Sequence, residues 1–217
     1  MSKEIQAYQG LPALIRIAAQ TTENRMPSLL LASSSPYRRQ LLARLRLPFT
    51  CSSPDIDESR LPGESATHLV KRLAQQKAQA LAGDHPDHLI IGSDQVAVLG
   101  DEVLGKPHDF ERALAQLSAA SGQSVSFLTG LAVLNTRTGQ CQVDCVPFTV
   151  HMRELDTDTL QRYLHAEQPY DCAGSFKAEG LGVMLFRSTE GPDATSLVGL
   201  PLIRLVDMLM QEGVSIP

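Results

Sequence analysis

The sequence predicts an α/β protein built on a mixed, twisted sheet flanked by helices. Short apolar runs alternate with amphipathic helical patterns early in the chain, and two longer strand patterns joined by a polar turn come later. The chain has 217 residues, of which 43% are hydrophobic, enough for one sizeable core or for two lobes around a central cleft. Trp is absent and aromatic residues make up 5%, so aliphatic side chains must fill most of that core.

Each element follows from a local pattern. Runs of apolar or alternating residues predict strands at 28–32, 48–53, 89–92, 124–134 and 141–153. Helical patterns are expected from 36 to about 47, from 65 to near 83, from 109 to near 122, from 156 to about 167, and from 201 onward. Ser65, Asp109 and Asp156 are expected at helix starts, since such side chains cap free backbone N–H groups. Residues 100–101 predict the turn of a hairpin, and residues 54–63 an acidic loop.

The first 25 residues differ from those that follow. A short helical pattern over 6–19 is interrupted by Pro12, and no strand or chemical motif comes before Met26. We therefore expect residues 1–25 to be an N-terminal extension of unknown role, and residues 26–217 to form the functional domain.

Composition and charge exclude several classes of protein. The chain carries 19 Lys and Arg against 24 Asp and Glu, a net charge of −5, which argues against a nucleic-acid partner or an anionic membrane surface. No apolar run approaches the roughly 20 residues that cross a bilayer. The four cysteines form no C-x-x-C pair and no signal sequence is evident, so a cytoplasmic protein is expected. An anionic ligand would require basic residues gathered in one place.

A serine-rich turn at residues 33–39 is the strongest local signal. Pro36 suits the first position of a helix, and the preceding serines can cap that helix. Arg38 and Arg39 then fall in the first helical turn, where the helix dipole disfavours cations. A phosphate chain over the free N–H groups, held also by serine hydroxyls and the guanidinium groups, would remove this conflict. The alternative is two solvated arginines on a surface helix.

Four further charged residues could meet a bound phosphate. Lys77 lies on the apolar stripe of its helix, so it either extends to the surface or points into a cleft. Asp94 follows the apolar strand 89–92 and would lie at its carboxyl end, where α/β proteins often place ligand groups. A carboxylate there could bind Mg²⁺ or accept a proton from an attacking water, or it could cap a turn. Glu58 could be a second such carboxylate and Lys106 a further phosphate contact, although a solvated loop would carry the same residues.

Several familiar catalytic motifs are absent from the sequence. It contains no G-x-x-x-x-G-K-[ST] loop, no G-x-G-x-x-G turn, no H-E-x-x-H and no G-x-S-x-G elbow. The six histidines show no ligand spacing. Zinc chemistry and Ser-His-Asp hydrolysis are therefore not expected.

Five motifs together resemble those of the Maf family of nucleotide pyrophosphatases. They occur in the family's order from about Met26 to near the C-terminus. The motifs are LASSSPYRR at 31–39, GSDQ at 92–95, GKP at 105–107, CAGSFKAEG at 172–180 and LVGLP at 197–201. The resemblance implies a Maf-like domain over residues 26–217, with two lobes around a cleft, and a homodimer.

The resemblance also implies a reaction and the residues that perform it. The family hydrolyses a nucleoside triphosphate to the monophosphate and pyrophosphate with a divalent metal, Mg²⁺ or Mn²⁺. By match to the motifs, the phosphates would be held by Ser33, Arg38, Arg39, Lys77 and Lys106. Glu58 and Asp94 would lie at the metal and the water, with Asp94 as proton acceptor and Lys77 as a further catalytic group. The resemblance leaves open which carboxylate binds the metal.

Three positions, Tyr37, Gln95 and Glu179, resemble the specificity residues of the branch that acts on 7-methyl-GTP. Glu179 could accept hydrogen bonds from the N1–H and N2–H₂ groups of guanine. The ring of Tyr37 suits a cationic methylated base, a contact worth roughly 0.5–2 kcal/mol. The alternatives are a dTTP or UTP pyrophosphatase, disfavoured by Glu179, and a nucleotide-binding regulator of cell division or septation.

Overall fold

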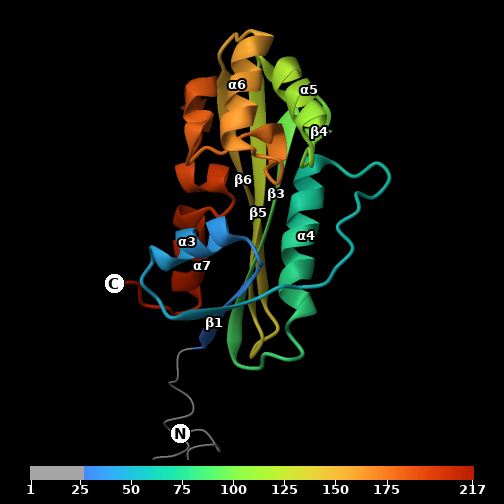
Figure 1. Ribbon diagram of the computed structural model, residues 1–217. Coiled ribbons are helices and arrows are strands. Elements are labelled where there is room, and N and C mark those ends of the chain that lie inside the picture. Colours follow the sequence, from blue (N-terminus) through green and yellow to red (C-terminus); the bar gives the residue numbers. More distant parts are fainter. Residues whose placement is uncertain (1–26) are drawn as a thin grey trace, which may run out of the picture.

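A seven-stranded mixed sheet forms the centre of the computed structural model, which describes residues 27–217 (Figure 1). The strands are β1 (Ser28–Ala32), β2 (Phe49–Ser52), β3 (His88–Leu99), β4 (Glu102–Leu104), β5 (Ser124–Asn135), β6 (Cys141–Met152) and β7 (Phe186–Glu190). Their order is β2-β1-β3-β5-β6-β7, with β4 paired to β3 outside this path. β1 pairs in parallel with β2 and β3, whereas the other pairs are antiparallel. The predicted α/β class with a mixed sheet is confirmed.

Helices of the described residues cover this sheet. They are α3 (Pro36–Ala43), α4 (Ala66–Ala80), α5 (Phe110–Ala120), α6 (Thr157–Glu167) and α7 (Leu202–Gln211), with three short 3₁₀ segments, η1 (Ala173–Ser175), η2 (Leu181–Leu185) and η3 (Ala194–Val198). Ser65, Asp109 and Asp156 each accept a hydrogen bond from a backbone N–H of the helix that follows, as predicted. No helix among the described residues is long and apolar enough to cross a membrane.

Helix α3 is shorter than the sequence pattern predicts. It ends at Ala43 rather than near residue 47, and Arg46 adopts the left-handed conformation with φ 55°. Pro48 disfavours a helical conformation at the residue before it. Leu41 and Leu42 are buried, whereas Leu45 is only partly buried beyond the end of the helix. The chain therefore turns early into β2.

Strand β3 is longer than predicted, which changes the position of Asp94. Its parallel pairing with β1 ends at Gly92, where the predicted strand also ends. The antiparallel pairing with β5 continues to Leu99, so Asp94 lies within the strand, opposite Gly130. The prediction that Asp94 stands at the carboxyl end of its strand is wrong, because β5 extends β3 beyond the apolar run. Asp94 does lie just past the carboxyl end of the neighbouring strand β1.

Alternate residues of the central strands face different helices (Figure 1). Leu31 and Ile91 pack in a cluster with side chains of α3 and α7. Leu30 and Ile90 pack on the other face with Ala74 and Ala78 of α4. This alternation is the period of two that an extended strand imposes. A separate cluster under α5 and α6 contains Phe127, Phe148 and Tyr163.

Helix α4 packs against two glycines of the sheet. A Cβ atom built on Gly92 would lie 2.0 Å from the carbonyl oxygen of Ala74, and one on Gly130 would lie 2.0 Å from that of Val70. Glycine within a strand often marks such a close approach of backbones. Any side chain at either position would force the helix away from the sheet.

We expect Gly92→Ala to lower the free energy of unfolding by about 3 kcal/mol, the upper part of the range for overpacked sites, because the obstacle is backbone rather than a flexible side chain. Urea denaturation would measure the change. Gly83→Ala is the matched control, since a Cβ there meets no atom within 4 Å. A surface substitution of this kind changes stability by no more than about 0.5 kcal/mol. Equal stability of the two variants would contradict the prediction.

Candidate active site

A cleft of about 690 Å³ gathers residues from distant parts of the chain. Its walls come from the turn before α3, the loop before α4, the middle of β3, the β4–α5 loop and the segments around η1 and η3. The predicted site residues that line it are Ser33, Tyr37, Arg38, Glu58, Lys77, Asp94, Gln95, Lys106 and Glu179. The structure thus brings all but one of the predicted site residues to a single cavity.

Arg39 is the predicted residue that does not line the cleft. It is exposed and borders a separate hollow with Gln40, Phe49 and Cys51. Successive residues of a helix point about 100° apart, so Arg38 and Arg39 cannot both face the same ligand from one helical turn. The phosphate-binding role of Arg39 stays a prediction that the geometry does not support.

An ammonium group lies between two carboxylates on one wall of the cleft. Lys77 Nζ is 2.7 Å from Asp94 Oδ1 and 2.8 Å from Glu58 Oε1. Lys77 and Asp94 are each only 7% exposed, whereas the Glu58 side chain is 58% exposed. Lys77 belongs to the buried face of α4, and its apolar stem crosses that face while the charged end enters the cleft. Two acids and one base leave an excess negative charge at this point.

The serine-rich turn carries Arg38, which also lines the cleft. Ser35 caps α3 by accepting a hydrogen bond from the Arg38 N–H at 3.4 Å, and Ser33 Oγ accepts one from the Ser35 N–H at 3.1 Å. The Arg38 side chain donates from Nε to the carbonyl oxygen of Gly199 at 2.8 Å, and its other N–H groups are further donors. Burial lowers the pKa of the guanidinium, while Asp94 and Glu58 oppose that shift.

This arrangement explains how a cation is tolerated in the first turn of α3. The Gly199 carbonyl oxygen compensates Arg38 locally, and the carboxylates on the far side of the cleft add to this effect. An anion in the cleft would still meet the N-terminal end of α3, where backbone N–H groups and the helix dipole favour negative charge. Lys106, on the exposed loop between β4 and α5, adds a cation at the rim.

Gln95 is held in one orientation by the protein. Its Nε2 donates to Thr129 Oγ1 at 2.9 Å and to the Ser196 carbonyl oxygen at 2.6 Å. Thr129 Oγ1 donates to the same carbonyl oxygen at 2.9 Å and therefore acts as an acceptor toward Gln95. The amide oxygen points away from these acceptors. Gln95 therefore offers a hydrogen-bond acceptor to a ligand in the cleft.

Acidic groups surround Tyr37 at another part of the cleft. Burial raises the pKa of the Tyr37 hydroxyl to about 12, and Cys172, Asp171 and Glu179 add to the shift. Asp171 and Glu179 line the cleft and are exposed. A negative potential beside an aromatic ring favours a cationic or hydrogen-bond-donating ligand over an anionic one.

Two polar residues of the sheet, Ser93 and Thr129, form hydrogen bonds with segments of the cleft. Neither of them was assigned a role from the sequence. Ser93 Oγ lies 2.9 Å from the carbonyl oxygens of both Gly130 and Gly199, and Thr129 fixes Gln95. Both side chains are fully buried. For Thr129 the sequence does carry a signal, because this polar residue directly follows the apolar pair Phe127 and Leu128 within a strand. Such an interruption of the core face is typical of a residue that serves a site.

Two carboxylates of the cleft could supply some of the ligands of a divalent metal, if the phosphates of a substrate supplied others. Within residues 27–217 no group of three or more His, Cys, Asp or Glu side chains could hold a metal ion by itself. The carboxylates of Asp94 and Glu58 nevertheless lie close together, because both contact the Lys77 ammonium. Mg²⁺ is commonly bound by one or two carboxylates, with substrate phosphates and water as the remaining ligands.

Comparisons with known proteins show the family of this chain. The family model described as Maf-like protein matches residues 28–212. A protein of Pseudomonas syringae pv. syringae named 7-methyl-GTP pyrophosphatase is 79% identical over 192 residues, which are 88% of this chain and 100% of that protein. Proteins of the same name from Pseudomonas aeruginosa and Alcanivorax borkumensis are 70% and 61% identical, over 88% and 89% of this chain and 100% and 98% of their own lengths. The chain therefore belongs to the Maf-like protein family.

Proposed function

We propose that this protein hydrolyses 7-methyl-GTP to 7-methyl-GMP and pyrophosphate. The observation that carries the proposal is the grouping of charges within one cleft: Lys77 and Arg38 lie near Asp94, whereas Tyr37 lies near Glu179. The first group suits a phosphate chain and the second a cationic purine. Relatives at 70–79% identity are named for this activity.

Phosphates would be bound at the basic side chains of the cleft. The Arg38 guanidinium and the start of α3 offer N–H donors from one side, and the Lys77 ammonium offers a charge from the other. Ser33, which is 8% exposed, and Lys106 would complete the contacts. These groups stabilise the charge that collects on pyrophosphate as it leaves.

In this proposal Asp94 accepts the proton of the attacking water. The water oxygen bonds to the α-phosphorus, the bond between that phosphorus and the α–β bridging oxygen breaks, and the water proton passes to the Asp94 carboxylate. Lys77 orients this carboxylate through its 2.7 Å contact with Oδ1. Oδ2 of the same group remains available for the proton.

We propose further that Asp94 and Glu58 hold Mg²⁺ or Mn²⁺ together with the substrate phosphates. The metal would supply charge neutralisation and polarise the phosphoryl oxygens. Glu58 is the more exposed carboxylate of the two and its loop approaches the cleft from outside the sheet. Lys77 balances both carboxylates and keeps them together.

The base would be recognised by Tyr37, Gln95 and Glu179. Methylation at N7 gives guanine a positive charge, which the ring of Tyr37 and the carboxylate of Glu179 both favour. The amide oxygen of Gln95 is an acceptor, as its nitrogen is engaged by Thr129. Uracil and thymine present carbonyl oxygens that these acceptors would repel. The homodimer implied by the family and the cytoplasmic location expected from the sequence stay predictions.

A panel of 7-methyl-GTP, GTP, dTTP and UTP with Mg²⁺ tests the substrate. We expect the highest kcat/KM for 7-methyl-GTP, with 7-methyl-GMP and pyrophosphate as the products identified by chromatography. Glu179→Gln should reduce the preference over GTP by about tenfold, because the amide no longer attracts the positive charge of the methylated base, whereas both purines carry the same N–H donors. The melting temperature should stay unchanged. Equal or faster turnover of dTTP or UTP by the wild type would overturn the substrate assignment.

Asp94→Asn should lower kcat for 7-methyl-GTP by about a hundredfold to ten-thousandfold, because an amide cannot accept the proton. Pyrophosphate release measures the rate. Asp144→Asn is the matched control, since Asp144 pairs with Arg204 and does not line the cleft. Wild-type pyrophosphate release by Asp94→Asn would refute the mechanism. Nucleotide binding by the wild type with no product formed would instead favour the regulatory role.

Removal of divalent metal should stop the reaction without unfolding the protein. We expect no pyrophosphate release in excess EDTA and recovery on addition of Mg²⁺ or Mn²⁺, because the phosphate charge is then neutralised again. Circular dichroism checks that the fold persists. Undiminished turnover in EDTA would contradict the metal requirement.

A further inference from the structure

The loop between β2 and α4 carries Glu58 into the cleft although residues 53–65 contain no helix or strand. Most of its side chains are exposed. Ile56 packs against the small cluster that includes Leu69 and Leu73, whereas Leu61 is 53% exposed. A segment with little buried apolar surface opens easily unless polar contacts hold it. The position of Glu58 therefore depends on the hydrogen bonds of this loop.

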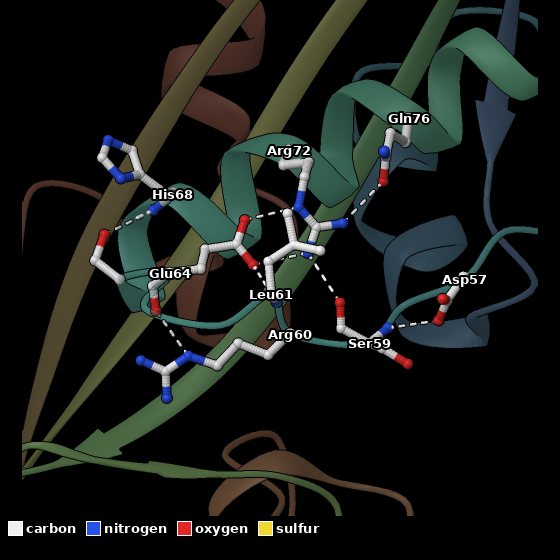
Figure 2. A network of polar contacts seen from close by, with 9 residues as sticks. Asp57, Ser59, Arg60, Leu61, Glu64, His68, Arg72 and Gln76 are labelled. Carbon is white, nitrogen blue, oxygen red and sulfur yellow. Dashed lines mark hydrogen bonds and ion pairs between the residues drawn. The ribbon is translucent and has the colours of Figure 1, made fainter.

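Arg72 of α4 is the centre of those hydrogen bonds (Figure 2). Its Nε donates to Glu64 Oε1 at 2.7 Å and its Nη2 to Glu64 Oε2 at 2.8 Å, a bidentate pair. Nη2 also donates to the backbone carbonyl oxygen of Ser59 at 3.0 Å. Nη1 donates to Gln76 Oε1 at 3.0 Å, which orients the guanidinium from the same helix. One side chain thus joins both ends of the loop segment 59–64 to α4.

Glu64 also forms hydrogen bonds within the loop, near the start of α4. Its Oε2 accepts a hydrogen bond from the Leu61 N–H at 3.1 Å, and its backbone carbonyl oxygen accepts one from Arg60 Nε at 2.7 Å. The Glu64 side chain is 8% exposed. The hydrogen bond from Arg72 lowers the pKa of the Glu64 carboxyl to about 2, so the ion pair with Arg72 persists at neutral pH.

Glu58 lies at the middle of a turn that this network fixes. Asp57 Oδ1 accepts a hydrogen bond from the Ser59 N–H at 2.9 Å, which closes the turn around Glu58. Arg72 holds the carbonyl oxygen of the same Ser59. Both peptide groups of Ser59 are therefore restrained, and the Glu58 carboxylate is presented to Lys77 at 2.8 Å.

We propose that Arg72 and Glu64 are positioning residues, which hold the loop so that the Glu58 carboxylate stays at Lys77 in the reactive part of the cleft. Neither needs to touch the substrate. The inference rests on the proposed function, in which Glu58 contributes to metal binding. It adds to the site an ion pair, Arg72 with Glu64, whose role is to place the Glu58 carboxylate.

The test is a double-mutant cycle on the full chain with 7-methyl-GTP and Mg²⁺. We expect Arg72→Gln and Glu64→Gln each to lower kcat by about tenfold to a hundredfold, the range found for residues that orient ligating groups, with a smaller change in KM. In a chain that already carries Glu58→Gln, Arg72→Gln should have no further effect on kcat. The effects of two substitutions are non-additive in this way when one residue acts through the other.

Arg204→Gln is the matched control, because Arg204 forms a comparable ion pair with Asp144, 2.7 Å apart, away from the cleft lining. It should keep the wild-type kcat. Wild-type kcat in Arg72→Gln, or the same fractional loss with and without Glu58→Gln, would overturn the inference. The second result would assign Arg72 a general role in stability.

Arg72→Lys keeps the test decisive if Arg72→Gln fails to fold. Lysine retains the charge but cannot bridge Glu64 and Ser59 with a planar fork, so a folded Arg72→Lys should lose kcat in the same direction. Wild-type kcat in that variant would also overturn the inference. Failure of the proposed function would appear differently, since the wild type itself would then release no pyrophosphate from 7-methyl-GTP.

Discussion

Backbone contact between α4 and the sheet determines where the charged groups of the cleft can stand. Gly92 and Gly130 leave no side chain between the strands and the carbonyl oxygens of Ala74 and Val70. At this separation a lysine of α4 reaches a carboxylate two residues along β3 from Gly92, as Lys77 and Asp94 do at 2.7 Å. A desolvated ion pair of this kind is favourable only with accurate geometry and further partners. The two glycines supply the geometry.

The cleft also shows how an acidic protein can bind a polyanion. The chain has a net charge of −5, yet Arg38, Lys77 and Lys106 line one cavity. In the proposed function, the acids of the same cavity would be divided between the metal and the base of the nucleotide. Charge would then vary along the length of the ligand, so that a molecule with a negative tail and a positive head would fit in one direction only.

Local patterns in the sequence predicted much of the fold. Helix caps such as Ser65 and Asp109 could be identified because capping is a short-range interaction between neighbouring residues. The end of β3 could not, since its extension from Ser93 to Leu99 depends on pairing with β5, about thirty residues away along the chain. The cleft residues around η1 and η3 follow no regular period, and only their resemblance to known motifs drew attention to them. Likewise Arg72 and Glu64 look like ordinary surface charges until the loop is folded over α4.

The carbonyl oxygen of Gly199 accepts hydrogen bonds from both Arg38 and Ser93, and so it connects the first helix of the described residues and the third strand to a segment near the end of the chain. During synthesis on the ribosome, the serine-rich turn and β3 emerge long before this carbonyl group does. A nascent chain consequently lacks the partner that sets the Arg38 guanidinium until nearly all residues have been translated. In the proposed function, nucleotide binding of full strength would thus belong to the finished polypeptide, and proteolytic loss of the segment that carries Gly199 would weaken it even if the sheet survived.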